Sequence, residues 1–144
     1  MAYYPPVGFH FKVQFSISDE GLDTHFQKVS GLTVEYGTET IIEGGENRFE
    51  HKLPVRTQYA DLSLQRGLLL DSKVLKWCLD AFENRIFKPA DMQIMLLNEQ
   101  HQPLKTWSVT GAWPKKWAVS DFNAQENAVV IESLELSYQY FKLI

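Results

Sequence analysis

The sequence predicts a mainly β (α+β) fold: a small antiparallel β-barrel or sandwich with one flanking α-helix. Two runs carry this prediction, because apolar side chains recur in them at every second residue, as in strands with one buried face. They are residues 9–17 (FHFKVQFSI) and 130–140 (VIESLELSYQY). One stretch, residues 72–84, shows helical spacing instead. Antiparallel sheets tolerate one solvated face, so alternating strands with a single helix favour this architecture.

The length and composition are those of a single-domain globular protein. The 144 residues fit one domain spanning 1–144, and 44% hydrophobic with 22% charged residues is an ordinary balance. A net charge of −4 without a long Lys/Arg cluster gives nucleic-acid binding little electrostatic support. The single cysteine excludes an intrachain disulfide, and no apolar run is long enough to span a membrane. The N-terminus lacks the features of a signal peptide, so we expect synthesis in the cytoplasm.

We expect the segment around the double glycine Gly44-Gly45 to extend away from the folded body. Before it, residues 26–42 have β-type composition interrupted by two glycines, and they form either two short strands or one kinked strand. After it the chain is polar and charged, and Pro54 argues against a central strand. We therefore expect an extended loop at about residues 43–58 that contacts a partner.

The predicted helix begins after Asp71 or Ser72, either of which can cap its N-terminus. It runs to about Asn84, and residues 91–97 and 104–113 then flank a turn and predict an antiparallel hairpin. The buried stripe of the helix is expected to comprise Leu75, Cys78, Leu79 and Phe82. Three further apolar residues widen this stripe and lead us to expect a contact with a partner on a second side: Val74, Trp77 and Ala81.

No pattern in the sequence indicates an active site. The four histidines do not stand at metal-ligand spacing, and Cys78 lies on an apolar helix stripe, where a small core residue is the expected role. Gly44-Gly45 lacks the further residues of a phosphate-binding or dinucleotide-binding loop. We therefore predict no catalytic residue, no cofactor and no metal, and a protein that is not an enzyme.

One aromatic and basic region supports a different class of function. Trp107, Trp113 and Trp117 accompany Lys115-Lys116, a combination that can stack single-stranded nucleic acid on a β-barrel. Aromatic residues on adjoining strands are more often core or subunit contacts, and the negative net charge agrees with that interpretation. A nucleic-acid-binding module therefore remains the minor alternative.

Several segments, taken in order and spacing, resemble the inner tube protein of contractile tails. That family builds the tubes of contractile phage tails and of phage-tail-like extracellular contractile injection systems. The chain departs from the usual ending at Tyr138-Gln139-Tyr140. The segments that carry the resemblance are residues 26–32 (FQKVSGL), 43–45 with Asn47, 62–67 (LSLQRG) with Asp71, 75–77 (LKW), 107–115 (WSVTGAWPK) and 131–136 (IESLEL).

The resemblance implies a structural subunit that assembles with itself. Six protomers would form a ring whose sheets join into one barrel around a lumen, and stacked rings would form a tube driven through a target envelope by a contracting sheath. The implied partners are further copies, a sheath protein, baseplate or spike and tape-measure proteins, and cargo in the lumen. Assembly would place the chain in a phage tail or in a particle released from the cell. A type VI secretion tube that carries effectors is the nearest alternative.

The resemblance also assigns roles to particular residues. The expected inter-ring contact loop projects along the tube axis, and the helix is expected outside the lumen, with Val74, Trp77 and Ala81 at a ring or sheath interface. Ser133, Glu135, Ser137 and Gln139 are expected to face either the lumen or the sheath. The loop residues are Glu43, Gly44, Gly45, Glu46, Asn47, Arg48, Glu50, His51 and Lys52.

Overall fold

The computed structural model describes residues 10–17, 25–41, 51–69, 72–125 and 129–144. Its elements comprise nine strands and one helix, α1 (Lys73–Asn84). The strands are β1 (His10–Phe15), β2 (Lys28–Ser30), β3 (Val34–Ile41), β4 (His51–Tyr59), β5 (Leu62–Gly67), β6 (Ala90–Leu97), β7 (Pro103–Val119), β8 (Ile131–Ser137) and β9 (Tyr140–Leu143). The expected class, mainly β with one helix, is confirmed.

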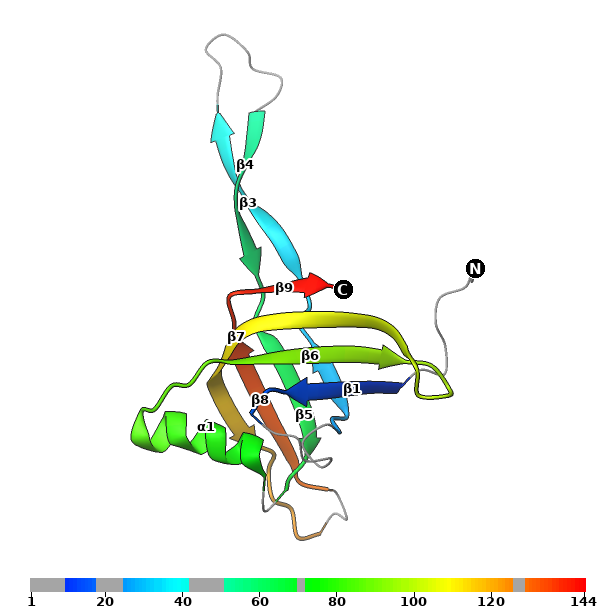
Figure 1. Cartoon of the computed structure of the whole chain (residues 1–144). Coiled ribbons are helices and arrows are strands. Elements are labelled where there is room, and N and C mark those ends of the chain that lie inside the picture. The colour runs from blue at the N-terminus through cyan, green and yellow to red at the C-terminus, as the bar shows by residue number, and fades with distance from the viewer. Residues whose placement is uncertain (1–9, 18–24, 42–50, 70–71, 126–128) are drawn as a thin grey trace.

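The strands form one main sheet and a separate two-stranded ribbon. The main sheet has the order β1-β6-β7-β8-β5-β2, with β9 paired to β7, and every pairing in it is antiparallel. Among the described residues, β3 pairs only with β4, and the two strands form a ribbon that projects away from the main sheet (Figure 1).

The long strand β7 joins the two halves of the main sheet. Its first part, up to Ala112, pairs with β6 and β9, and its second part, from Trp113, pairs with β8. The change of partner follows Gly111, which has a positive φ of 70° and whose N–H donates to Asp91 Oδ1 at 3.0 Å. Glycine adopts this backbone conformation without strain, so the strand can bend here and fold the sheet around a core.

The core lies between the two halves of this bent sheet. Strand residues supply it alternately, as in β5 and β8, where every second side chain is buried. The fully buried side chains include Val13, Phe15, Leu62, Leu64, Met92, Val109 and Leu136. α1 covers one end of the bent sheet, where Trp77 packs against Phe15 with 5.9 Å between ring centroids.

One ion pair is buried in this core. Arg66 of β5 and Glu132 of β8 are each 3% exposed, and Arg66 Nε donates to Glu132 Oε2 at 3.1 Å. Arg66 also donates to Ser72 Oγ at 3.0 Å and lies over the Phe26 ring, while Trp117 Nε1 donates to Glu132 Oε1 at 2.9 Å. A buried charge needs such partners, so these contacts tie two strands to the start of the helix.

The helix boundaries follow the predicted capping. Ser72 is the N-cap, and its Oγ accepts a hydrogen bond from Leu75 N at 3.2 Å. The helix ends at Asn84, and the next residue, Arg85, is its C-cap with a left-handed φ of 55°. In the part of the chain that the structure describes, no helix is long and apolar enough to cross a membrane.

The prediction for the outer face of the helix is wrong. Val74, Trp77 and Ala81 are 1%, 7% and 3% exposed, so they face the core of their own chain together with Cys78. Trp77 Nε1 also donates to the Lys88 carbonyl oxygen at 2.7 Å, so the indole N–H has its hydrogen-bond partner within the same chain. The helix is rotated from the expected orientation, and Phe82, which was expected inside, is 44% exposed.

The extended loop predicted at residues 43–58 is in part a strand. His51 and Lys52 begin β4, which pairs with β3 from Ile41↔His51 to Val34↔Tyr59. Pro54 is compatible with β4, because β4 pairs with β3 alone in the described part of the chain and is therefore not a central strand. The remaining residues of the expected contact loop, Glu43 to Glu50, lie outside the described part of the chain.

Candidate assembly surfaces

The half of the sheet formed by β2, β5, β8 and the second part of β7 presents a polar outer face. Cross-strand registers place Ser30, Ser63, Glu135 and Lys116 in one row and Lys28, Gln65, Ser133 and Ala118 in the next. The residues between them, such as Leu64, Leu134 and Leu136, are buried in the core. We call these eight residues and Ser137 the polar face.

The structure places three of the four predicted lumen residues on this face. Ser133, Glu135 and Ser137 share one side of β8 and are half-buried, opposite the core side chains of the same strand. Gln139 lies beyond the end of β8, in the connection to β9, and its side chain packs beside Gly111. Gln139 is therefore not part of the polar face.

A charged group borders the polar face at an irregularity in β7. Lys115 stands where the register between β7 and β8 shifts, and its Nζ donates to Asp61 Oδ2 at 2.7 Å. This hydrogen bond and the charge of Asp61 raise the pKa of Lys115, with a smaller contribution from Glu135. The lysine therefore stays protonated here and links the start of β5 to β7.

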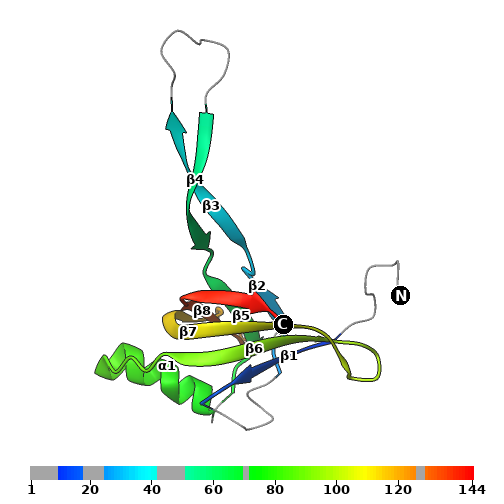
Figure 2. The ribbon, with the colours of Figure 1, turned by 45° about the horizontal axis from the view of Figure 1, so that its top comes forward.

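The ribbon β3–β4 is exposed on both of its faces. Its large apolar side chains Val34, Tyr36, Ile41, Leu53 and Val55 are each between 44% and 63% exposed. Both views of the chain show the ribbon projecting beyond the main sheet, without another strand at its side (Figures 1 and 2). An isolated two-stranded hairpin is only marginally stable in water, so this ribbon has the properties of a segment that a partner covers.

The root of the ribbon is fixed to the body by aromatic side chains. Tyr59, the last residue of β4, packs against Tyr138 and Phe141 with centroid separations of 5.9 and 5.1 Å. Tyr138 donates its hydroxyl to the Ala60 carbonyl oxygen at 2.7 Å. Burial, followed by the charges of Asp61 and Tyr59, raises the pKa of Tyr138 to about 12. The ribbon therefore leaves the body in a defined direction.

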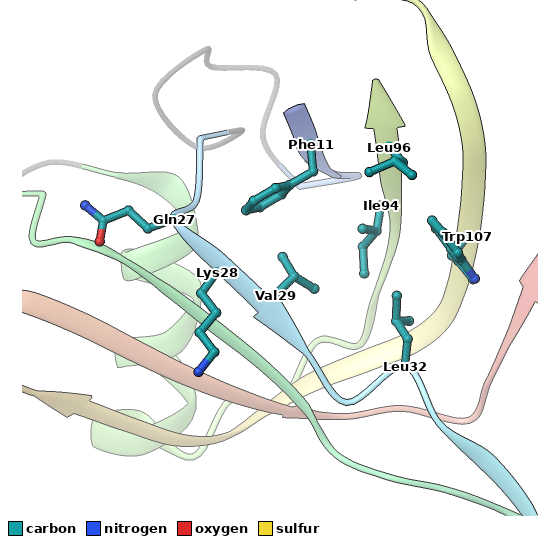
Figure 3. A pocket seen from close by; sticks show the side chains of 8 residues that line it. All are labelled: Phe11, Gln27, Lys28, Val29, Leu32, Ile94, Leu96 and Trp107. Atoms are coloured by element: carbon teal, nitrogen blue, oxygen red, sulfur yellow. The ribbon is translucent and has the colours of Figure 1, made fainter. Parts of the chain in front are cut away.

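An open apolar cavity of about 390 Å³ lies between the edge strands β1 and β2. Phe11, Val29, Ile94 and Leu32 face one another across it, with Leu96 and Trp107 at the sides (Figure 3). Gln27 and Lys28 border it. It lies where the bent sheet does not close on itself, because β1 and β2 each have one partner strand in the described part of the chain.

The three tryptophans of the predicted nucleic-acid surface lie in different environments. Trp107 borders the apolar cavity, Trp117 bonds to the buried Glu132, and Trp113 packs edge-on against Phe87 with 5.9 Å between centroids. They do not form the row of exposed rings that stacking on successive bases requires. Among the described residues there is also no cluster of three or more His, Cys, Asp or Glu side chains suited to a metal ion.

Comparison with known families identifies the family to which the chain belongs. The sequence profile of the T4-like virus tail tube protein gp19 family matches residues 7–142. This match covers nearly the whole chain, and the chain belongs to this family of tail tube proteins, which are structural subunits and not enzymes. No curated protein matches the sequence.

Solved structures show the same fold over almost the full length. A chain of the six-fold symmetrised baseplate of the anti-feeding prophage is 29% identical, with a TM-score of 0.85 over 99% of this chain and 97% of that chain. A chain of the PVC extracellular contractile injection system, from its extended sheath-tube complex, is 24% identical, with a TM-score of 0.82 over 99% and 93%. Hcp1 from Flavobacterium johnsoniae, at 14% identity, has a TM-score of 0.54 over 92% and 93%.

Membership of the family settles the general role that the resemblance implied. The chain is a tail tube subunit of the kind found in contractile injection systems, as predicted from the sequence.

The buried ion pair Arg66–Glu132 is the main feature that sequence reasoning missed. Its only signal was Glu132 at an apolar position of an alternating strand, opposite an arginine at the equivalent position of another strand.

Proposed function

We propose that six copies of this chain form a ring in which the polar face lines a central channel. The observation that carries the proposal is the four-stranded half-sheet β2-β5-β8-β7, which has a polar outer face and two edges without a partner strand in the described chain. Joining these edges between copies would satisfy the backbone groups of β2 and of β7 from Trp113 to Val119. A point group with six-fold symmetry closes such a head-to-tail contact.

The size of the resulting barrel suits an aqueous channel. Six copies of four strands, spaced ~4.8 Å apart and tilted by ~40°, give a barrel roughly 50 Å across at the backbone. Small and polar side chains such as Ser63, Ser133 and Ser137 leave the interior of such a barrel wide and hydrated. The six-fold symmetrised assembly that contains the similar anti-feeding prophage chain supports this ring order.

The ribbon is the contact between rings in this proposal. It extends from the body, carries uncovered apolar side chains and leads into residues 42–50, which include the charged loop expected to reach the next ring. The exposed Phe82 of α1 would contact the sheath that surrounds the tube. A similar chain lies in a sheath-tube complex, which supports the sheath as a partner, and another lies in a baseplate, which supports the baseplate as a partner.

The remaining partners follow from the same assembly. A tape-measure protein would set the tube length, a spike would close its end, and the channel would hold cargo. The particle would be a phage tail or a phage-tail-like injection system acting outside the producing cell, as the similarity to the PVC chain supports. The type VI secretion tube remains the alternative, and the likeness to Hcp1 supports it at the level of fold only.

Negative-stain microscopy of two chains tests the proposal. The unmodified chain, produced with its sheath and baseplate partners, is expected to form hexameric rings stacked into tubes. A variant in which an Asn-Gly turn replaces residues 38–54 shortens the ribbon and is expected to give rings that do not stack. A stable monomer of the unmodified chain under all conditions would refute the ring, and tubes of normal length from the shortened variant would refute the role of the ribbon.

A further inference from the structure

The polar face differs in charge from the chain as a whole. The complete chain carries a formal net charge of −4 at pH 7. The charged members of the polar face are Lys28, Lys116 and Glu135, which leaves this face with one positive charge in excess. The ion pair Lys115–Asp61 at its border adds no net charge. The other members are small or uncharged: Ser30, Ser63, Gln65, Ala118, Ser133 and Ser137.

The two lysines stand on the two edge strands of the half-sheet, and both are exposed. Lys28 lies on β2, where its cross-strand partner is the uncharged Gln65. Lys116 lies on β7, where its partner is Glu135 of β8. In the proposed ring, β2 of one copy joins β7 of the next, and we call this line of contact the seam. Each seam then carries both lysines with a single glutamate beside them.

The seams give the channel of the proposed ring a repeating positive charge. A ring of six copies has six seams, and stacked rings repeat them along the tube. Charges of one sign that line a passage with low-dielectric walls act together and raise the local concentration of the opposite charge. The channel is therefore expected to attract anionic molecules although the chain as a whole is acidic.

The channel has room for a folded protein whose surface lies close to these lysines. The proposed barrel is roughly 50 Å across at the backbone. A folded domain of about 100 residues has a radius of gyration of about 13 Å. Such a domain leaves a gap to the wall that is comparable with the Debye length of about 8 Å at physiological ionic strength. The field of the lysines therefore reaches its surface.

The composition of the polar face favours a protein over a nucleic acid. Single strands bind to exposed aromatic rings along a basic groove, and the polar face contains no aromatic residue. Duplex DNA is held through many contacts of Lys and Arg with phosphates, whereas each copy offers Lys28 and a lysine that is paired with Glu135. The serines bury no apolar surface against a passing protein, so a protein attracted here can still move along the channel.

We propose that the channel selects folded cargo proteins with an acidic surface, and that Lys28 and Lys116 attract them. The inference rests on the proposed function, because it requires the polar face to line the channel. It adds the chemical class of the cargo to that proposal. Attraction between solvated charges is screened by salt, so loading of the cargo falls as the ionic strength rises.

Loading of two probe proteins into tubes tests this selection. The probes are fluorescently labelled variants of one domain of about 100 residues that differ only in surface charge, one acidic and one basic. Tubes of the unmodified chain are assembled at low salt with an equal mixture of the probes. Fluorescence that sediments with the tubes and is shielded from a quenching antibody reports probe inside the channel. We expect about fivefold more acidic than basic probe, and equal amounts at about 1 M salt.

Two variants with the same change of charge locate the attraction. Lys28→Glu gives the polar face an excess of negative charge, so the preference is expected to reverse in favour of the basic probe. Lys76→Glu makes the same change on an exposed residue of α1, outside the polar face, and is expected to leave the ratio unchanged. Lys28→Gln introduces no carboxylate at the seam and is expected to bring the ratio close to equality. Electron microscopy checks that each variant forms tubes, and Lys28→Gln decides the outcome where Lys28→Glu forms none.

The outcomes separate the class of cargo from the proposed function. Tubes that load both probes equally, or in which Lys76→Glu changes the ratio as much as the Lys28 variants do, would overturn the inference alone. A labelled single-stranded oligonucleotide that loads in preference to the acidic probe would also overturn it, because the channel would then take nucleic acid. Failure of the unmodified chain to form rings or tubes would overturn the proposed function and the inference with it.

Discussion

Gly31 fixes the backbone where the body ends and the ribbon begins. Its φ is +99°, and a Cβ atom built on it would overlap the Asp61 backbone oxygen. Gly31→Ala should therefore lower the free energy of unfolding by about 2 kcal/mol or more, because alanine is strained at a positive φ and its Cβ would clash with rigid backbone. Gly67→Ala is the matched control, because its φ is not positive and its nearest neighbour is Val129 Cγ1 at 3.5 Å. Urea unfolding that gave equal losses for both variants would contradict this account.

Removing one partner of the ion pair Arg66–Glu132 is expected to destabilise the chain more than removing both charges. Arg66→Met leaves a buried carboxylate unpaired and should lower the free energy of unfolding by about 3–5 kcal/mol. Adding Glu132→Gln removes that charge while keeping an acceptor for Trp117, and should recover roughly half of the loss. Urea unfolding of the single and double variants measures this. A double variant as unstable as Arg66→Met would show that buried charge is not the cause.

Deprotonation of the Tyr138 hydroxyl is expected to destabilise the folded chain in strong alkali. Its pKa is raised to about 12 in the folded chain, against an ordinary value of about 10, so the folded state holds the phenol proton more tightly. This contribution is complete below about pH 10 and is lost as the pH rises through 12. Stability should fall more steeply between these values in the unmodified chain than in Tyr138→Phe. Parallel pH profiles of the urea midpoint would argue against this environment for Tyr138.

At the scale of elements, the orientation of α1 buries one of its aromatic residues and exposes the other. Trp77 is buried against Phe15, so Trp77→Glu should unfold the chain, with a loss of about 3–5 kcal/mol. Phe82 is exposed, so Phe82→Glu should leave the free energy of unfolding within ~0.5 kcal/mol and reduce sheath attachment. Urea unfolding and co-sedimentation with the sheath protein measure the two effects. Unchanged sheath binding by Phe82→Glu would remove the helix from that interface.

Most elements could be predicted from sequence because their patterns are local. The alternation in β1 and β8, the Ser72 cap and the hairpin β6–β7 follow from residue spacing and turn chemistry. The helix face could not be fixed, because its apolar stripe is wider than the buried surface and tertiary packing selects the side. The strand β4 was not predicted, but the statement that Pro54 excludes a central strand holds, because β4 pairs with β3 alone in the described part of the chain.

The candidate surfaces were predictable to different degrees. The polar side of β8 is visible as an alternation in the sequence, so Ser133, Glu135 and Ser137 could be placed on one face. The full polar face requires the registers between β2, β5, β8 and β7, which bring together residues far apart in sequence. The apolar cavity likewise depends on two edge strands that sequence order does not relate.

At the scale of the whole molecule, the uncovered surfaces of the described chain are those that the proposed ring and stack would bury. The described residues bury one core, and none of them covers the two strand edges, the apolar ribbon or the apolar cavity. In the proposed assembly, a ring would cover the strand edges and a stack of rings would cover the ribbon. The tail tube family to which the chain belongs is consistent with this organisation.

A cryo-electron microscopy reconstruction of tubes assembled from the unmodified chain would show how the copies are arranged. We expect six copies per ring, a continuous barrel built from β2, β5, β8 and the second part of β7 of every copy, and Ser63, Ser133 and Glu135 facing the channel. A reconstruction in which these residues face the sheath, or in which neighbouring copies do not join through β2 and β7, would contradict this arrangement.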